Sequence, residues 1–252
     1  MDFDNINRRI IKLWTEESKN NDQDSLSIVP QLLFNPHKIN KKGTLLYVGI
    51  NPSFSSTNFK WLAKKMGDID RDIAVQLDNE KKVERFYSWA DDKVDDDYYS
   101  LLKKIEYFFI ENYPYFKKAN IIAEKCGLNL QSIDVFLNRE TSQNCLKKAI
   151  FKNQKDLILT DFAKKQLEIF FESIKVIKPK AILVGNALAS DIIKKYKTDN
   201  IVFDEKIGTY FLKEKGFSAP IFFSGMLSGQ RALDNHSIER LEWHIKNCLN
   251  IN

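Results

Sequence analysis

Cysteine is scarce in this chain, and its three copies, Cys126, Cys145 and Cys248, stand far apart in the sequence. No two of them have the close spacing of a zinc-binding or iron–sulfur motif. This argues against a disulfide framework and against a metal site built from thiolates.

Long hydrophobic runs are also missing. No apolar segment approaches the roughly 20 residues that a membrane-spanning helix needs. Residues 1–4 (Met-Asp-Phe-Asp) are acidic and lead into no apolar stretch of the kind found in a signal peptide. We therefore expect a cytoplasmic protein with no membrane partner.

Charge of one sign is not in large excess. The 39 lysines and arginines against 34 acidic residues give a net charge of +5. So mild a surplus allows transient contact with nucleic acid but does not suit a protein that coats it permanently. The hydrophobic fraction of 43% allows a packed core, and 252 residues suit one large domain better than two small ones.

Strands alternate with helices along the chain. This predicts an α/β protein, a three-layer sandwich with a central, mostly parallel sheet of four to five strands flanked by helices. A first helix with Ile6, Ile10, Leu13 and Trp14 on its apolar face, and a loop, occupy residues 1–43. Further helices are expected at 98–113, 160–177, 187–196 and 237–249, and strands at 45–48, 130–137, 181–185 and 220–223, with 201–211 a hairpin or a strand and a loop.

Residues 54–97 are the least regular part of the sequence, with aromatic residues among many charges. We expect a partly helical insertion over the cleft, near the active site, because long insertions beside a site often carry function. The alternative is a surface excursion whose aromatic residues pack on the sheet.

The most informative segment is the apolar run 45–48 followed by Gly49-Ile50-Asn51-Pro52-Ser53. A short apolar run that ends in Gly and Pro is typical of a central parallel strand, and open α/β sheets bind ligands where such strands end. Because Pro52 fixes φ, Asn51 lies on a stiff turn at the mouth of the predicted cleft. A turn that merely ends the strand is the alternative.

Five segments in a shared order resemble the uracil-DNA glycosylase superfamily, and most of all its mismatch-specific uracil and thymine DNA glycosylase branch. Gly49-Ile50-Asn51-Pro52 is similar to the first motif of that branch. An aromatic pair that opens a helix, a strand with an R-x-T turn, a P-x-x-I-L-x-L-G-like strand and the loop of the second motif follow at 98–102, 132–141, 179–187 and 223–231. The resemblance covers about residues 44 to 249.

The resemblance implies hydrolysis of an N-glycosidic bond in DNA. Such an enzyme flips the base out of the stack, stabilises it as it leaves, and places a water against the anomeric carbon of the sugar. In the mismatch-specific branch an Asn of the first motif positions that water, and Asn51 is the matching residue. An amide orients water through its oxygen but is a poor general base, so the resemblance implies a slow enzyme that depends on the leaving group.

The base pocket that the resemblance implies is built from the first motif and from aromatic side chains that stack on the flipped base. For the aromatic pair at 98–99, a place in the core of the next helix is an open alternative. The candidate pocket residues are Gly49, Ile50, Pro52, Ser53, Phe54, Phe59, Tyr98, Tyr99 and Asp134.

Asp134 bears on which base is recognised. Several branches of the superfamily have an Asn near this position, five residues before the Arg that Arg139 matches, and it contacts the pyrimidine edge. An ionised Asp accepts hydrogen bonds but donates none, and cytosine offers an amino donor where uracil offers an acceptor. Asp134 therefore points to a cytosine-type base. The alternatives are a strand-end Asp paired with Arg139, or an alignment shifted by one residue, which places Val135 there.

The loop that matches the second motif departs from the family. Relatives begin it with His or Asn and then Pro-Ser, whereas this chain has Phe223-Ser224-Gly225. Met226 and Leu227 suit a wedge that fills the gap left by a flipped base. The remaining candidates for contact with DNA are Ser224, Gly225, Ser228, Gly229, Gln230 and Arg231, while a glycine-rich connection without a ligand is the alternative, and His236 has an electrostatic role or none.

These features together predict a monomeric, monofunctional DNA glycosylase without metal or cofactor that removes a uracil-like or modified pyrimidine base. The altered second motif and the insertion suggest a base other than plain uracil, such as a bulky modified pyrimidine of phage DNA, and Asp134 points to a modified cytosine. The resemblance to superfamily members that act in antiphage defence implies such a role here, with housekeeping repair as the alternative. Two rivals remain: a catalytically idle DNA- or nucleotide-binding module with the same fold, and a hydrolase of free nucleosides.

Overall fold

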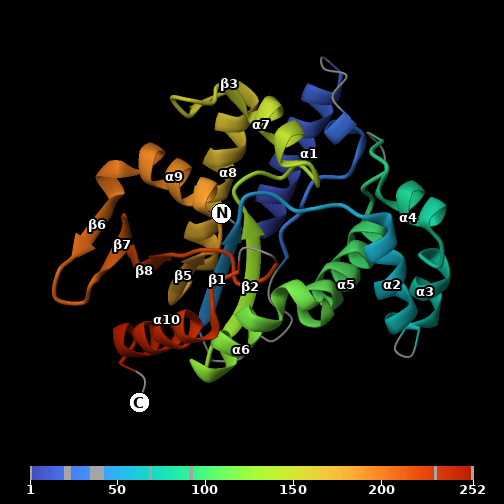
Figure 1. The fold of residues 1–252 in the computed structure, drawn as a ribbon. Coiled ribbons are helices and arrows are strands. Elements are labelled where there is room, and N and C mark those ends of the chain that lie inside the picture. Colours follow the sequence, from blue (N-terminus) through green and yellow to red (C-terminus); the bar gives the residue numbers. More distant parts are fainter. Residues whose placement is uncertain are drawn as a thin grey trace.

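The computed structural model describes residues 2–19, 24–34, 43–67, 70–90, 93–229 and 232–250. Its centre is a six-stranded sheet in the order β2–β1–β5–β8–β7–β6 (Figure 1). Four neighbouring strands are parallel: β2 (Asn129–Asp134), β1 (Thr44–Gly49), β5 (Ala181–Val184) and β8 (Phe217–Phe223). The antiparallel strands β7 (Thr209–Glu214) and β6 (Ile201–Asp204) extend the sheet beyond β8.

The predicted α/β class is confirmed, and the sheet is larger than the four to five strands expected. The reason is local. The segment expected to be a hairpin or a strand with a loop is a hairpin, β6–β7, and its second strand pairs with β8.

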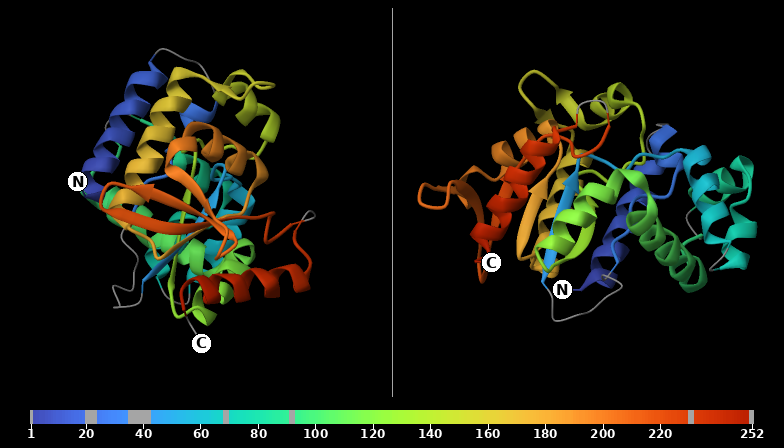
Figure 2. Two further views of the ribbon diagram at one scale, coloured as in Figure 1. Left: turned by 90° about the vertical axis from the view of Figure 1, so that its left-hand side faces the viewer. Right: turned by 60° about the horizontal axis from the view of Figure 1, so that its bottom comes forward.

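Helices cover both faces of the sheet, as Figure 2 shows from two sides. Leu46 and Val48 of β1 pack into the core beneath α1 (Phe3–Ser18), α8 (Asp161–Ile177) and α9 (Ala187–Tyr196). Leu45 and Tyr47 pack on the opposite side, against α6 (Lys117–Lys125) and α10 (Asn235–Cys248). Both faces of β1 are therefore buried, as expected of a central parallel strand.

The insertion contains three helices, α2 (Ser56–Met66), α3 (Arg71–Gln76) and α4 (Glu80–Tyr87). They lie beside α5 (Asp96–Asn112), at the side of the molecule, and not over the carboxyl ends of the strands (Figure 1). A stacked pair of rings, Phe59 on Phe109 with centroids 4.9 Å apart, joins α2 to α5. The insertion is partly helical, as expected, and its helices pack against α5. Tyr87, at the end of α4, lies against Arg139 of the loop after β2, with the guanidinium 5.0 Å from the ring centroid, and whether the insertion covers a cleft stays a prediction.

Short elements complete the fold. Helix α7 (Gln143–Ile150) leads into a two-stranded hairpin, β3 (Phe151–Asn153) and β4 (Ile158–Leu159). Single turns of 3₁₀ helix occur at Asp24–Ser27, Pro114–Phe116 and Thr198–Asn200. No helix in the described part of the chain is both long and apolar enough to cross a membrane.

Residues 29–34 run alongside β2 and make hydrogen bonds with this strand and with the loop that follows it. The Gln31 N–H donates to the carbonyl of Leu137 at 3.0 Å. Asn7 of α1 holds the same segment, since its amide donates to the carbonyl of Leu33 at 2.6 Å and accepts from the Leu33 N–H at 2.8 Å. Residues 29–34 thereby connect helix α1 to the loop after β2, which contacts Asn51.

Candidate active site

The loops that follow the parallel strands meet at one edge of the sheet. In the register of the strands, Gly49 lies opposite Asp134, Val48 opposite Val184, and Val184 opposite Phe223. The first-motif loop after β1 and the second-motif loop after β8 are therefore at the same edge, with only β5 between them. Ligands of open α/β sheets bind at this edge.

The side chain of Asn51 joins the loop after β1 to the loop after β2. Its Nδ2 donates to the carbonyls of Glu140 at 2.7 Å, Asn138 at 3.0 Å and Pro52 at 3.1 Å. Three carbonyl oxygens around one terminal atom fix the orientation of the amide, because an amide oxygen placed there would meet only other oxygens.

The other end of the same amide is open. Asn51 is partly exposed, and its Oδ1 accepts no hydrogen bond from any residue that the structure describes. The oxygen is held in place by the bonds of Nδ2 and has room to accept a hydrogen bond from a water or a ligand. The geometry is that of a fixed acceptor.

Two buried polar residues hold the carbonyls that Asn51 contacts. Arg139, which is 3% exposed, donates to Glu106 of α5 at 2.7 Å and to the carbonyl of Val29 at 3.0 Å. Gln166 of α8 is fully buried; it donates to the side-chain oxygen of Asn138 at 2.9 Å and accepts from the N–H of Leu137 at 2.7 Å. The loop after β2 is thus held by hydrogen bonds to α5 and residue 29 on one side and to α8 on the other.

Asp134 occupies the end of β2 and turns toward β1. Its Oδ2 accepts from the Gln31 amide at 3.1 Å, while the Asp134 N–H donates to the Gln31 oxygen at 3.0 Å. Its other oxygen lies over Gly49, where an added Cβ would come within 2.1 Å. Any side chain at position 49 would therefore displace the Asp134 carboxyl from this place. Asp134 is not ion-paired with Arg139, whose side chain donates to Glu106 and Val29 instead.

Burial raises the pKa of the Asp134 carboxyl to about 7, against the opposing effects of the Gln31 hydrogen bond and the Arg139 charge. Both protonation states are therefore populated near neutral pH. The ionised form only accepts hydrogen bonds, whereas the neutral form can donate one. A carboxyl with such a pKa beside a fixed amide is typical of a functional site.

The aromatic pair of α5 makes hydrogen bonds to neighbouring elements. The Tyr98 hydroxyl donates to the carbonyl of Phe86 at 2.9 Å, and Asn7 donates to the Tyr99 hydroxyl at 2.8 Å. Both side chains therefore take part in the packing of α5 on its neighbours, which is the alternative that the sequence left open, and their part in a base pocket stays a prediction. Phe59 is buried in the core.

Other first-motif residues remain near the edge. Phe54 is partly exposed, and its carbonyl accepts a hydrogen bond from Thr141 in the loop after β2. Pro52 is partly exposed and Ser53 is exposed, whereas Gly49 and Ile50 are buried. Of the aromatic candidates, Phe54 is thus the one that the structure keeps beside the loop of Asn51.

The sequence did not predict a pair of tyrosines, Tyr47 and Tyr115, near this edge. The hydroxyls of Tyr47 and Tyr115 are 3.3 Å apart, and the Tyr47 ring fills the space beside Gly185, where an added Cβ would lie 2.5 Å from the hydroxyl. Burial raises the pKa of the Tyr115 hydroxyl, and Tyr47 and Asp134 raise it further. Gly49 lies opposite Asp134, and Tyr47 precedes Gly49 by two residues in β1, so Tyr47 and Asp134 are on the same side of the sheet.

The second-motif loop is anchored to this tyrosine pair. Ser228 donates to the carbonyl of Tyr115 at 2.8 Å, and Gly229 has a φ of 93°, which favours glycine. Leu227 is completely buried and belongs to the core, so the expectation that it wedges into DNA is corrected for this conformation. Met226 is partly exposed, so its proposed role as a wedge in DNA stays a prediction.

The other candidates for contact with DNA lie in the same loop or, for His236, on α10. Ser224 and Gly225 are partly exposed where β8 ends. Gln230 and Arg231 lie outside the described residues. His236 is on the exposed side of α10, 3.3 Å from Glu239.

A site for a metal ion is not evident. Among the residues that the structure describes, no group of three or more His, Cys, Asp or Glu side chains could hold one. Cys126 is buried, Cys248 is partly buried and Cys145 is exposed.

Sequence reasoning missed the residues that brace the site, namely Gln31, Glu106 and Gln166. One signal was available: Gln166 stands on the apolar face of α8, beside Phe162, Leu167 and Phe170, where a polar residue needs a partner. Comparisons with protein-family models, with curated proteins and with solved structures gave no match.

The orientation of the Asn51 amide can be tested by substitution. In Asn51→Asp a carboxylate oxygen replaces Nδ2 and faces three carbonyls, so at pH 8 this variant should be less stable than Asn51→Ala by roughly 1–3 kcal/mol. The deficit should shrink as the pH falls and the carboxyl gains a proton that it can donate. Urea unfolding at pH 5 and pH 8 measures both effects.

The matched control is Asn186→Asp. Asn186 caps α9 through its oxygen, which accepts from the N–H of Ala189 at 3.0 Å, so Asp should be tolerated there. Equal stability of Asn51→Asp and Asn51→Ala at pH 8 would mean that the amide is not oriented as described.

The raised pKa of Asp134 makes a second prediction. The folded protein binds its proton more tightly than the unfolded chain, whose carboxyl has an ordinary pKa of 3.8, so this group lowers stability as the pH rises from about 4 to 7. An asparagine at this position has no charge to bury. Asp134→Asn should therefore gain on the order of 2 kcal/mol of unfolding free energy, relative to the wild type, between pH 5 and pH 8. A pH-independent difference would contradict the assignment.

Proposed function

We propose that this chain is a monofunctional DNA glycosylase that hydrolyses the N-glycosidic bond of a flipped uracil-like or modified pyrimidine base. The observation that carries the proposal is the Asn51 amide, whose Nδ2 is bound to three carbonyls while its Oδ1 accepts no hydrogen bond from the described residues and can hold a water. The residue stands on the motif that resembles the mismatch-specific branch, at the edge where ligands bind.

In this mechanism the Asn51 Oδ1 accepts a hydrogen bond from the attacking water and aims its oxygen at the anomeric carbon. The bond between carbon and water oxygen forms, the bond to the base nitrogen breaks, and the bonding pair leaves with the base. The proton of the water passes to solvent or to the departing base. Because an amide barely accepts a proton, the rate depends on how well the base leaves.

Asp134 is the candidate for reading the base, since it lies beside Gly49, and only Ile50 separates Gly49 from Asn51 in the chain. Its ionised form suits the amino group of a cytosine-type base, and its neutral form suits the carbonyl of a uracil-type base. Tyr115 and Phe54 are the aromatic residues best placed to line the pocket. A modified cytosine in antiphage defence and a uracil in repair both fit this chemistry.

The rival proposal is a catalytically idle DNA- or nucleotide-binding module. It draws support from the second-motif loop, which begins Phe223-Ser224-Gly225 and offers no His or Asn to the leaving base. The enzyme proposal draws support from the free oxygen of Asn51. In either case we propose a cytoplasmic monomer with DNA as its partner and with no cofactor.

The enzyme proposal predicts a clear phenotype for Asn51→Ala. Loss of the fixed water acceptor should slow single-turnover base release by roughly 10²-fold or more, while affinity for the same oligonucleotide changes little. Asn79→Asp, which alters only the cap of α4, away from the carboxyl ends of the strands, should retain the wild-type rate. Base release at the wild-type rate by folded Asn51→Ala would remove Asn51 from the mechanism.

Salt dependence separates a DNA-binding protein from a binder of small nucleotides. Binding to DNA should weaken with a slope of roughly −0.9 per contacted phosphate in a plot of log affinity against log salt concentration. A protein whose ligand is a free nucleotide or nucleoside should show a far shallower slope. Fluorescence anisotropy with a labelled oligonucleotide, over a series of salt concentrations, distinguishes the two.

A further inference from the structure

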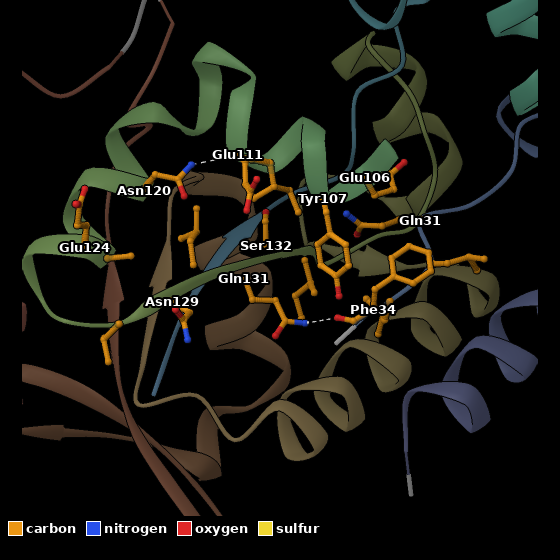
Figure 3. Close-up of a pocket in the computed structure, with 17 residues that line it drawn as sticks. Gln31, Phe34, Glu106, Tyr107, Glu111, Asn120, Glu124, Asn129, Gln131 and Ser132 are labelled. Carbon is orange, nitrogen blue, oxygen red and sulfur yellow. Dashed lines mark hydrogen bonds between the residues drawn. The ribbon is translucent and has the colours of Figure 1, made fainter. Parts of the chain in front are cut away.

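A cavity of about 720 Å³ lies within the insertion, between α2 and α3, and is called the α2–α3 cavity below. It is separate from the cavity of about 550 Å³ beside the outer edge of β2, which Figure 3 shows between α5, α6 and residues 31–34. Its volume is in the range of small-molecule sites in proteins. Asn51, Asp134 and the second-motif loop are not among its lining residues, so the proposed glycosylase site does not account for it.

Apolar residues from both helices line the α2–α3 cavity. Ala63 of α2 is buried and Ala74 of α3 is partly buried, and their small side chains leave the space between the helices open. Trp61 and Val75 line the same cavity and are 39% and 61% exposed. Large apolar side chains that are exposed together in a hollow are typical of a surface that binds a ligand or a partner.

Two contacts hold the indole of Trp61 in its exposed position. The ammonium of Lys65 lies over the ring, 4.2 Å from its centroid. The ring of Tyr113, which follows α5, meets the indole edge to face, with the centroids 6.4 Å apart. The apolar wall is therefore in place before a ligand binds, which lowers the entropic cost of binding.

Part of the charge in the lining is balanced within the insertion. Lys60 of α2 is 3.8 Å from Glu80, and Asp78 forms an ion pair with Lys82 at 3.0 Å. These groups leave little net charge in their part of the cavity.

The unbalanced charges of the lining are Lys64 and Arg71, which form no ion pair with another residue that the structure describes. Lys64 is in the last turn of α2 and Arg71 is the first residue of α3, so both lie near the point where the chain passes from one helix to the next. A guanidinium binds a carboxylate through two parallel hydrogen bonds, and a lysine adds a second positive charge. The α2–α3 cavity therefore combines a positive end with an apolar wall.

The length of the cavity adds to this description. Its lining residues on α2 run from Thr57 to Gly67, which corresponds to about 15 Å along the helix axis. An elongated ligand with one anionic head and an apolar chain matches this shape and this distribution of charge. A DNA strand would need positive charges along its whole path and would leave the apolar wall without a partner.

We propose that the α2–α3 cavity binds a single-chain amphipathic carboxylate of the fatty-acid class. The carboxylate pairs with Arg71 and Lys64, and the hydrocarbon chain lies along Ala74, Val75 and Trp61. The proposal concerns a site separate from that of base release and does not depend on it.

Isothermal titration of the full chain with sodium decanoate at low salt tests the proposal. We expect one decanoate to bind per chain. Butyrate has the same carboxylate without the long chain, and decylamine has the same chain with the opposite charge. Both should bind roughly tenfold more weakly than decanoate, or weaker still.

Charge variants test the head of the ligand. The double variant Lys64→Gln, Arg71→Gln should weaken decanoate binding roughly tenfold or more. The control Arg8→Gln, Lys12→Gln removes two exposed positive charges of α1, outside the cavity, and should leave the affinity unchanged. Equal weakening by the two double variants would overturn the proposal.

A pair of tryptophan variants tests the apolar wall independently of charge. Folded Trp61→Ala should bind decanoate less tightly, whereas Trp243→Ala, which removes a 66% exposed tryptophan of α10 outside the cavity, should bind it as the wild type does.

Four further outcomes would overturn the proposal. They are no binding of decanoate to the wild type, equal binding of decanoate and decylamine, equal affinities of folded Trp61→Ala and Trp243→Ala, and binding to vesicles of an anionic lipid without binding of free decanoate. The last result would make a membrane surface the partner. None of these outcomes bears on base release, which is measured with DNA.

Discussion

The hydrogen bonds from Asn51 Nδ2 to the carbonyls of Asn138 and Glu140 are the interaction on which the site depends. They link two loops that are 87 residues apart in sequence and adjacent only because β1 and β2 are parallel neighbours. Arg139 and Gln166 hold those carbonyls from within the core. The orientation of Asn51 thus depends on the pairing of β1 with β2. It also requires several buried polar groups, and each of them needs a hydrogen-bond partner.

The same edge of the sheet holds the carboxyl of Asp134 in a fixed position, where burial disfavours its charged form. Asp134 lies over Gly49 and is held by Gln31, an arrangement that raises its pKa to about 7. A carboxyl that changes its protonation state near neutral pH can exchange the role of acceptor for that of donor. Such a group destabilises the fold at neutral pH, and proteins commonly accept this at places where they bind or react with a ligand.

Local physics made much of the fold predictable. Apolar residues at helical spacing indicated α1, and a Thr cap and a long apolar face indicated α8. The strand that leads to Asn51 was recognisable from its apolar run and from Gly49 and Pro52. Long-range packing was not predictable: the short helices α6 and α7 carry weak signals, the insertion bends back onto α5, and Leu227 turns inward. The partners Gln31, Glu106 and Gln166 become visible only when the chain has folded.

The central claim is that this edge releases a base from DNA. Alkali cleavage of labelled oligonucleotides after incubation with the protein measures it most directly, with uracil, a G·T mismatch, 5-hydroxymethylcytosine and its glucosylated form in single and double strands. We expect abasic sites at one of these bases. Intact strands throughout a set of oligonucleotides that the protein demonstrably binds would contradict it.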